Sequence, residues 1–422
     1  MSTTAASQLA TEGGPKTVTL PVPAWPVVEE ADAQMVADVI RSGVWSWVGP
    51  REREFCEAYA KFIGTKFCLG LSNGTVTIQC ALQAVGVVPG DEVIVPALTW
   101  VATAQAAMDV GANVVFADID PVTLGLDPAS FEASITPRTK AVVPVHLYGC
   151  MCDMDAILDI ARRHNVKVVE DVAHQHGSQW RGKGAGSLGD AGSFSFQQSK
   201  VLTSGEGGAI TCSDPDVYQT AFALKQVGWT PENPSVDPFS PLIQGKKYGH
   251  NYRITEMQAA LLVCGLKRLP EQTRRREVNA QRIAAELAAQ GGPLQVAPRD
   301  PRITTQAYYA LTLTYDAGKA GGVPRARYLA ALSAEGCGLG ATYGLVYQNS
   351  LLNLADSTSP LPFRENLPQD YTTLRLPNAE KAVNETAVNM SQKHLLGSDE
   401  YVGQLVAAVG KVNDNLDRLR EK

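Results

Sequence analysis

The chain has 422 residues, 45% of them hydrophobic, and a formal net charge of -6, which together predict a globular protein of two or three domains. The acidic balance, the polar N-terminus and the lack of an apolar run of about 18 residues argue against a nucleic-acid partner, a secretory signal and a membrane span, so we expect a cytoplasmic protein. Eight scattered cysteines, with Cys150 and Cys152 as a lone C-x-C, predict reduced thiols and no metal site.

Residues 1–20 are mostly small and polar, and they predict a loose tail. From about residue 30 to residue 265, short apolar runs alternate with helical stretches, which is typical of a mostly parallel sheet covered by helices on both faces. Helices are expected at Gly74–Gly86, where apolar residues recur at i, i+4 and i+7, and at Asp153–His164. The expected strands are Phe67–Leu71, Glu92–Pro96, Val114–Ala117, Ala141–Val145, Val166–Glu170, Ser193–Phe196 and Gly208–Thr211.

The first of these strands leads through a glycine turn into a helix, with Gly74 and Thr75 at the junction. Free backbone N–H groups at a helix N-terminus bind phosphate, a glycine permits close approach, and a threonine adds a hydroxyl. The junction is therefore a candidate phosphate site. Trp100 follows the second strand closely and fits either a core aromatic or a ring that stacks on a planar ligand.

Two polar residues, Asp171 and His174, come directly after the apolar strand Val166–Glu170. Asp171 fits a helix N-cap, and it equally fits a partner for a protonated ring nitrogen, which would let the ring accept electrons. His174 fits a histidine satisfied within a polar pocket, or a contact to a hydroxyl on such a ring. Both alternatives stay open for each residue.

The segment Gly184–Gly189 matches the G-x-G-x-x-G pattern of dinucleotide-binding loops, but a polar segment precedes it and a strand follows it. This context predicts a hairpin-like loop rather than a nicotinamide site, because the fingerprint needs a strand before it and a helix after it. The following strand leads to Lys200, at the edge where open α/β sheets bind ligands. A single lysine is usually a surface charge, but small and apolar neighbours here would desolvate the amine, lower its pKa and make it nucleophilic.

The second half of the chain departs from this alternation. Residues 228–252 contain four prolines and predict a long surface loop, which is followed by a helix through Gln258–Leu266 and a charged helix at Pro270–Gln290. A smaller α/β unit begins near residue 295, with a strand at Ala307–Tyr315. The expected organisation is a flexible tail (1–20), a large domain (21–268) and a small C-terminal domain (269–422).

Six motifs in this arrangement resemble the DegT/DnrJ/EryC1 group of pyridoxal 5'-phosphate (PLP)-dependent sugar aminotransferases, strongly over about residues 24–270 and more weakly beyond them. The resemblance implies an α/β protein with the fold-type I architecture of aspartate aminotransferase, PLP as cofactor, and a homodimer. The motifs are Ser72-Asn-Gly-Thr75, Gly90-Asp-Glu-Val-Ile-Val-Pro96, Val145-His-Leu-Tyr-Gly149, Glu170-Asp171, Ser193-Phe-Ser-Phe196 with Lys200, and Gly205-Glu-Gly-Gly208.

By this resemblance, Lys200 would hold PLP as a Schiff base and later carry the proton, and Asp171 would bind the ring nitrogen. His174 would stand beside the ring oxygen, where the family more often has glutamine, and Trp100 would stack on the ring. Some relatives have histidine in place of the lysine and act as dehydratases, so the presence of Lys200 favours transamination.

The phosphate of the cofactor would be bound, again by resemblance, by Gly74, Thr75 and Ser195. Asn251 lies in a segment that is similar to the family segment that reaches the cofactor of the neighbouring subunit. Each active site would then contain residues of both chains, and a monomer would be inactive.

The residues around Lys200 are more similar to one branch, the L-glutamine:scyllo-inosose and 2-deoxy-scyllo-inosose aminotransferases of aminoglycoside antibiotic biosynthesis. This likeness implies the transfer of an amino group from L-glutamine to a keto cyclitol. Two alternatives stay open: a keto sugar linked to a nucleotide, and the reaction of an aminohydroxybenzoate-synthase relative, which shares Gln197. His250, Tyr343 and Tyr347 are candidate contacts to a hydroxylated substrate.

Overall fold

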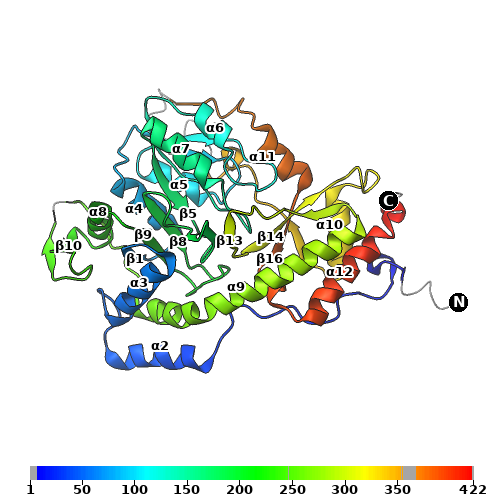
Figure 1. Cartoon of the computed structure of the whole chain (residues 1–422), viewed down its shortest axis with the longest axis horizontal. Coiled ribbons are helices and arrows are strands. Elements are labelled where there is room, and N and C mark those ends of the chain that lie inside the picture. Colours follow the sequence, from blue (N-terminus) through cyan, green and yellow to red (C-terminus); the bar gives the residue numbers. More distant parts are fainter. Residues whose placement is uncertain (1–6, 246, 353, 355–366, 421–422) are drawn as a thin grey trace.

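A seven-stranded sheet forms the centre of the larger part of the molecule (Figure 1). The computed structural model describes residues 7–245, 247–352, 354 and 367–420. The strand order is β1-β9-β8-β5-β4-β2-β3; β9 is antiparallel to both of its neighbours, and the other adjacent strands are parallel. The prediction of a mostly parallel sheet is thus confirmed. The strands are β1 (Phe67–Leu71), β2 (Glu92–Pro96), β3 (Asn113–Ala117), β4 (Thr139–Val142), β5 (Lys167–Asp171), β8 (Ala191–Ser195) and β9 (Gly208–Cys212).

The strands form where the sequence has buried apolar runs, but one of them ends early. β1 and β2 have the predicted bounds, whereas β4, expected at Ala141–Val145, ends at Val142. Pro144 has no N–H to donate to a neighbouring strand. Val145 pairs with Asp171 only as an isolated parallel bridge. The chain therefore leaves the sheet just where it reaches the carboxyl ends of the strands.

Each face of this sheet packs into its own apolar core. Side chains alternate along a strand, so Val93 and Val95 of β2 enter one core and Ile94 enters the other. The first face is covered by α4 (Gly74–Ala84), α5 (Ala102–Asp109) and α8 (Pro215–Lys225). The second face is covered by α3 (Pro50–Ile63), α6 (Pro128–Ala133), α7 (Met154–His164) and the first half of α9 (Glu256–Gln290).

The long helix α9 joins the two parts of the molecule, as Figure 1 shows. The sequence predicts two helices separated before Pro270, but the helix is continuous through this proline. A proline removes one N–H and crowds a carbonyl. Burial on both sides offsets this cost, since Leu269 packs into the core of the larger part and Ile283 into that of the smaller part. The domain boundary expected at residue 268 falls inside this helix.

The smaller part is a four-stranded antiparallel sheet with helices against it, in the strand order β12-β14-β16-β15. It confirms the expected C-terminal α/β unit. Its strands are β12 (Leu294–Val296), β14 (Ala310–Tyr315), β15 (Leu339–Ala341) and β16 (Ala387–Ser391). Its helices are α10 (Arg325–Ala334), α12 (Asp399–Asn413) and α13 (Leu416–Arg420), with η5 (His394–Leu396). The connection back to the larger part contains η2 (Val346–Gln348), α11 (Pro377–Lys381) and η4 (Ala382–Thr386).

The N-terminal segment differs from the predicted loose tail over residues 7–20, while residues 1–6 lie outside the described part of the chain. Leu9 and Val18 are buried in the core of the smaller part, on either side of η1 (Ala10–Glu12). Glu335 fixes the segment by accepting hydrogen bonds from the N–H groups of Ala10 and Thr17. Two apolar side chains and one buried carboxylate therefore order a stretch that is polar on average. The chain then continues into α2 (Glu30–Ser42), which packs on α9.

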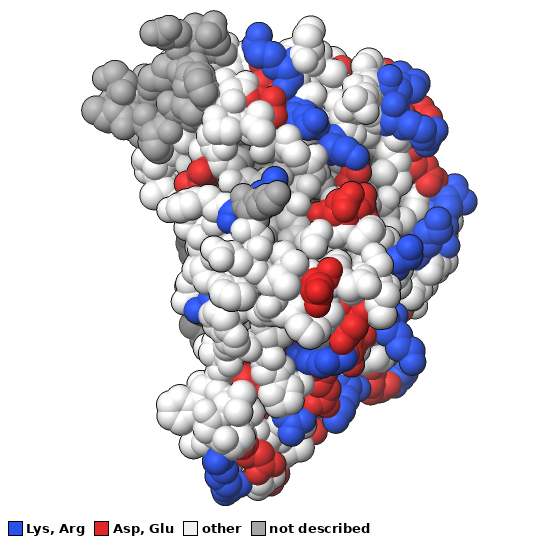
Figure 2. Space-filling model, turned by 90° about the vertical axis from the view of Figure 1, so that its left-hand side faces the viewer, with Lys and Arg blue, Asp and Glu red and all other residues white. Residues whose placement is uncertain are grey.

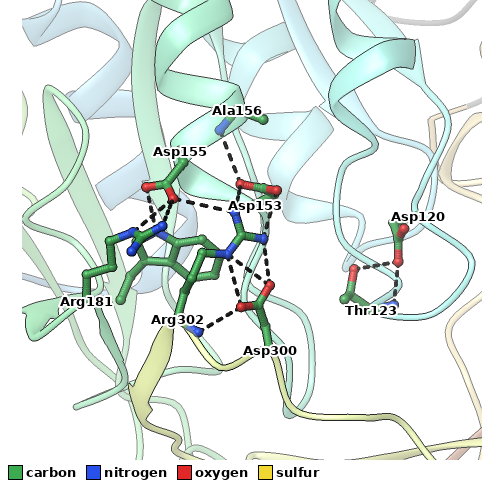
Figure 3. Close-up of polar contacts among 9 residues, drawn as sticks. Asp120, Thr123, Asp153, Asp155, Ala156, Arg181, Asp300 and Arg302 are labelled. Carbon is green, nitrogen blue, oxygen red and sulfur yellow. Dashed lines mark hydrogen bonds and ion pairs between the residues drawn. The ribbon is translucent and has the colours of Figure 1, made fainter.

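A cluster of charged side chains lies at the junction between the two parts of the molecule (Figure 3). Arg302 donates hydrogen bonds to Asp153 at 2.9 Å and to Asp300 at 2.6 Å, and Arg181 pairs with Asp155 at 2.9 Å. Next to this cluster a small sheet forms in the order β13-β6-β7. Its strands are β6 (Gln179–Trp180), β7 (Lys183–Gly184) and β13 (Ile303–Thr305).

The predicted surface loop at residues 228–252 contains a short hairpin, β10 (Trp229–Pro231) paired with β11 (Leu242–Gln244). It projects from the larger part at the left of Figure 1. None of the described helices combines the length and the apolar run that a membrane crossing requires.

Candidate active site

A cavity of about 710 Å³ opens at the carboxyl ends of the central strands. Its walls come from the segments that follow β1, β2, β4, β5 and β8, the edge at which sheets of this kind bind ligands. Of the predicted site residues, all but Asn251 line it in this single chain: Gly74, Thr75, Trp100, Asp171, His174, Ser195 and Lys200. Asn251 is exposed, and its backbone pairs with Gln226 at the end of α8.

Lys200 and Asp171 meet because β5 and β8 are adjacent and parallel. Asp171 is the last residue of β5 and pairs with Ser193 of β8, so the turn after β8 brings Lys200 to the same end of the sheet. Burial lowers the pKa of Lys200 to about 8, and the negative charge of Asp171 partly opposes this shift. The amine is therefore still mainly protonated at neutral pH, but a larger fraction of it is neutral and nucleophilic than for an ordinary lysine.

Asp171 is a buried carboxylate with two fixed hydrogen bonds. Its Oδ2 accepts from Thr103 Oγ1 at 3.0 Å, and its Oδ1 accepts from the N–H of Ala173 at 3.1 Å. Burial raises the pKa of Asp171, while these hydrogen bonds and the charge of Lys200 lower it. No helix begins at Asp171, so the N-cap alternative is wrong. The carboxylate faces the cavity instead and can accept a hydrogen bond from a protonated ring.

His174 is a buried, neutral imidazole. Its Nδ1 accepts a hydrogen bond from the N–H of Tyr148 at 3.1 Å, which leaves the proton of the neutral ring on Nε2. Burial lowers the pKa of His174 well below its usual value, and the nearby charge of Lys200 lowers it further. Tyr148 adopts a positive φ of 54°, and this backbone conformation accompanies the hydrogen bond to His174.

The N-terminus of α4 borders the cavity beside the end of β8. The first N–H groups of a helix have no acceptor within the helix, and those of Gly74 and Thr75 lie where an anionic group can bind them. Asn73 caps the helix by accepting from the N–H of Val76 at 3.0 Å. Gly74 is closely packed, since a Cβ there would lie 2.6 Å from the Cβ of Ser195.

Aromatic side chains form the remaining wall. Trp100 is 57% exposed, so it does not belong to the core, and its ring packs edge-on against Tyr343 with centroids 5.4 Å apart. Tyr343 lines the cavity, as the sequence suggests, but the other two candidate substrate contacts do not. The hydroxyl of Tyr347 donates to Glu380 at 2.8 Å, and His250 stacks on Tyr252.

Three further residues line the cavity that were not among the predicted site residues. Thr103 holds Asp171 from the first turn of α5, Glu206 adds a second carboxylate from the turn before β9, and Tyr309 comes from the segment before β14. The motif Gly205-Glu-Gly-Gly208 marks the neighbourhood of Glu206. Thr103 and Tyr309 are placed only by tertiary structure.

The glycine pattern at Gly184–Gly189 binds a carboxylate of its own chain. The N–H groups of Gly186, Leu188 and Gly189 donate to the buried Glu170 at 2.8–2.9 Å. His146 contributes a fourth contact through Nε2 at 3.1 Å. The segment starts in the β6–β7 hairpin, which confirms the predicted loop. Its anion-binding groups are thereby occupied, on the opposite side of β5 from Asp171.

Known proteins share this sequence and this fold. The sequence matches the DegT/DnrJ/EryC1/StrS aminotransferase family over residues 26–393. It is 38% identical over 421 residues to an L-glutamine:2-deoxy-scyllo-inosose aminotransferase of Streptomyces fradiae, covering 96% of this chain and 97% of that protein. It is 36% identical over 422 residues to an L-glutamine:scyllo-inosose aminotransferase of Streptomyces griseus, covering 97% of this chain and 98% of that protein.

Among solved structures, the crystal structure of 3-amino-5-hydroxybenzoic acid synthase matches with a TM-score of 0.81 and 30% identity, covering 93% of this chain and 98% of that chain. The likeness extends over both parts of the molecule, including the junction through α9. The chain therefore belongs to the DegT/DnrJ/EryC1/StrS aminotransferase family and is an aminotransferase of fold-type I.

Proposed function

We propose that this aminotransferase uses PLP and transfers an amino group from L-glutamine to a keto cyclitol, such as scyllo-inosose or 2-deoxy-scyllo-inosose, in aminoglycoside biosynthesis. The observation that carries the proposal is that Lys200 and Asp171 line one cavity at the carboxyl edge of the sheet. The donor and acceptor come from the names of relatives that align over nearly the whole chain.

The residues of the cavity fit PLP at each of its functional groups. The phosphate would bind at Gly74, Thr75 and Ser195, where the α4 N-terminus offers N–H groups. Gly74 packs closely on Ser195 and has no side chain that would fill this space. The exposed ring of Trp100 offers a flat surface for stacking. When bound, PLP supplies an aldehyde that condenses with amines and a ring that accepts electrons from the substrate carbon.

In this proposal the protein's own groups direct the chemistry. The amine of Lys200 would hold the cofactor aldehyde, and the free amine would move a proton from and to the substrate carbon. Asp171, as a carboxylate, holds a proton on the ring nitrogen, and its hydrogen bonds from Thr103 and Ala173 keep it oriented. His174, whose Nδ1 accepts from the N–H of Tyr148, would use its Nε2–H to donate to the oxygen on the ring.

The charge of the cavity favours a cyclitol over a nucleotide-linked sugar. Among the described lining residues, the charged side chains are Asp171, Glu206 and Lys200, and no arginine is present. A diphosphate is usually recognised by arginine or lysine side chains. A neutral, hydroxylated ring needs hydrogen-bonding groups and an aromatic surface instead, which Gln197, Ser199 and Tyr343 offer.

We further propose a homodimer in which Asn251 enters the site of the partner. The support is an exposed aromatic surface near this residue, where Tyr248 is 85% exposed and Trp47 is also exposed. Arg253 lies over the Trp47 ring, and two of its guanidinium nitrogens are buried without a hydrogen-bond partner. In Figure 2, charged side chains gather toward the right and the lower end of this side of the molecule, and the middle left is largely uncharged. The eight cysteines are buried and unpaired, in keeping with a reducing cytoplasm.

The test is a donor and acceptor screen on the purified protein loaded with PLP. We expect L-glutamine to aminate the cofactor, and scyllo-inosose or its 2-deoxy form to be converted to an amine detected by mass spectrometry. Nucleotide-linked keto sugars and L-glutamate serve as competitors. Borohydride should fix the cofactor to Lys200, which peptide mapping would show. A protein that takes up no PLP, or that aminates only nucleotide-linked sugars, would contradict the proposal.

A further inference from the structure

Tyr309 lies inside the cavity, although it belongs to the segment that leads into β14 of the smaller part. Its hydroxyl is hydrogen-bonded to Ser199 Oγ at 3.0 Å. The Nζ atom of Lys200 lies over its ring, 4.6 Å from the ring centroid. His174 stacks on the same ring, with centroids 3.8 Å apart and planes inclined by 13°. The ring therefore contacts two of the residues that the proposed chemistry uses.

The backbone on the N-terminal side of Tyr309 is anchored to the larger part of the molecule. The N–H of Tyr309 donates to the carbonyl of Tyr148 at 3.2 Å, and the N–H of Ala307 donates to Ser178 Oγ at 2.8 Å. Earlier in the same segment, Arg302 is held by Asp153 in the charged cluster of Figure 3. These contacts set the position of the ring relative to the central sheet.

The other side of Tyr309 is anchored to the smaller part. Its carbonyl accepts a hydrogen bond from the N–H of Gln392 at 2.9 Å. The side chain of Gln392 accepts two hydrogen bonds from the buried guanidinium of Arg276, at 3.0 and 2.7 Å. A buried guanidinium is costly unless it is hydrogen-bonded, so Gln392 is held in place. Hydrogen bonds from both parts of the molecule thus fix the position of the Tyr309 ring beside Lys200.

We propose that Tyr309 is a further catalytic residue, whose ring binds the ammonium form of Lys200 whenever this side chain is not joined to the cofactor. The ring thereby retains the proton carrier within the site between the steps of the reaction. The inference rests on the proposed function, because it takes Lys200 as the amine that binds PLP and moves the proton.

The physical basis is the attraction between a cation and an aromatic face, which is strongest where water is excluded. Lys200 is half-buried in the wall of the cavity, so water weakens this attraction less than it would at an open surface. The titratable groups that interact electrostatically with the amine are Asp171, His174 and His176, and Glu206 is a further carboxylate in the wall of the same cavity. Both histidines are kept neutral by burial, so they do not repel the ammonium. Asp171 and the ring of Tyr309 then both favour the charged form.

The first test measures the Lys200 amine in the cofactor-free protein. Competitive labelling with acetic anhydride across pH, followed by mass spectrometry of the Lys200 peptide, gives the pKa. Tyr309→Leu keeps the site apolar and removes the aromatic face, so it should lower the pKa of Lys200 by about 0.5 to 1.5. Tyr309→Phe keeps the face and should titrate like the wild type. Tyr309→Met takes the place of the leucine variant if that variant does not fold.

The second test uses the PLP-loaded protein and follows hydrogen exchange at the α-carbon of L-glutamine in D₂O. The maximal exchange rate should fall by about 3- to 30-fold in Tyr309→Leu with little change in KM, and Tyr309→Phe should restore it. An unchanged pKa of Lys200 in the leucine or methionine variant, or a loss confined to KM, would overturn the role of Tyr309. Borohydride fixation of PLP to a residue other than Lys200 would overturn the proposed function as well. Fixation to Lys200 with unchanged properties in the Tyr309 variants would overturn only the role of Tyr309.

Discussion

The contact between Gly74 and Ser195 predicts a measurable cost for a single methyl group. Gly74 begins α4, and a Cβ at this position would lie 2.6 Å from the Cβ, 3.0 Å from the Oγ and 3.3 Å from the Cα of Ser195. Ser195 is the last residue of β8 and is held in the sheet by its pairing with Gly208 of β9. The alanine methyl group can therefore be accommodated only if α4 and β8 move apart.

The magnitude follows from two opposing effects. Insertion of a methyl group into a closely packed site costs about 1–3 kcal/mol. Replacing a helical glycine by alanine gains about 0.5–1 kcal/mol from the backbone. We therefore expect Gly74→Ala to lower the free energy of unfolding by about 1–2 kcal/mol. Affinity for PLP should also fall, because the same displacement moves the N–H groups proposed to bind the phosphate.

Urea unfolding of the cofactor-free protein, followed by circular dichroism, measures this change. Gly403→Ala in α12 is the matched control, since a Cβ there meets only an Arg282 nitrogen at 3.5 Å, an ordinary contact. It should stabilise the protein by about 0.5–1 kcal/mol. The double variant Gly74→Ala with Ser195→Gly should recover about 1 kcal/mol relative to the sum of the single changes. If Gly74→Ala changes the free energy of unfolding by the same amount as the control, and shows no coupling to position 195, then α4 and β8 are not closely packed at this point.

Three further predictions concern the proposed chemistry. Because the pKa of Lys200 is lowered to about 8 from the usual lysine value of 10.5, the unfolded chain binds more protons between these values. The stability of the cofactor-free protein should therefore rise with pH across this range. In Lys200→Met, the urea midpoint should rise less with pH than in the wild type over the same range. Asp171→Asn should reduce turnover by about two or more orders of magnitude while the protein still folds. Near-normal turnover in a steady-state assay would mean that Asp171 has only a structural role. Lys200→Ala and Asn251→Ala should each be inactive, yet regain activity when refolded together as mixed dimers, and an inactive mixture would argue against a shared site.

The central sheet could be predicted from the sequence because its strands are buried on both faces. β1 and β2 read as short apolar runs bounded by turns, so their limits coincide with the pattern. The meeting of Lys200 with Asp171 could also be inferred, since both follow strands whose carboxyl ends share one edge of a parallel sheet. Local pattern and topology together were sufficient for the core of the site.

Features that depend on packing between distant segments could not be predicted in this way. The contact between Ser199 and Tyr309 joins residues 110 positions apart, and no motif marks Tyr309. The continuity of α9 through Pro270 and the ordering of the N-terminal segment around Leu9 have the same origin. In each case contacts between segments far apart in the sequence decide the structure, and the local pattern does not show them.

The loop at Gly184–Gly189 shows that a pattern of glycines predicts the binding of an anion but not which anion is bound. Glycines let successive N–H groups converge on one acceptor, whether it is a pyrophosphate or a carboxylate. Here the acceptor is Glu170, which precedes Asp171 on β5 and points to the opposite face of the sheet. Because the loop fixes Glu170, it also fixes the end of β5. The carboxylate that faces the cavity is thus held in part by a glycine loop whose N–H groups bind the neighbouring Glu170.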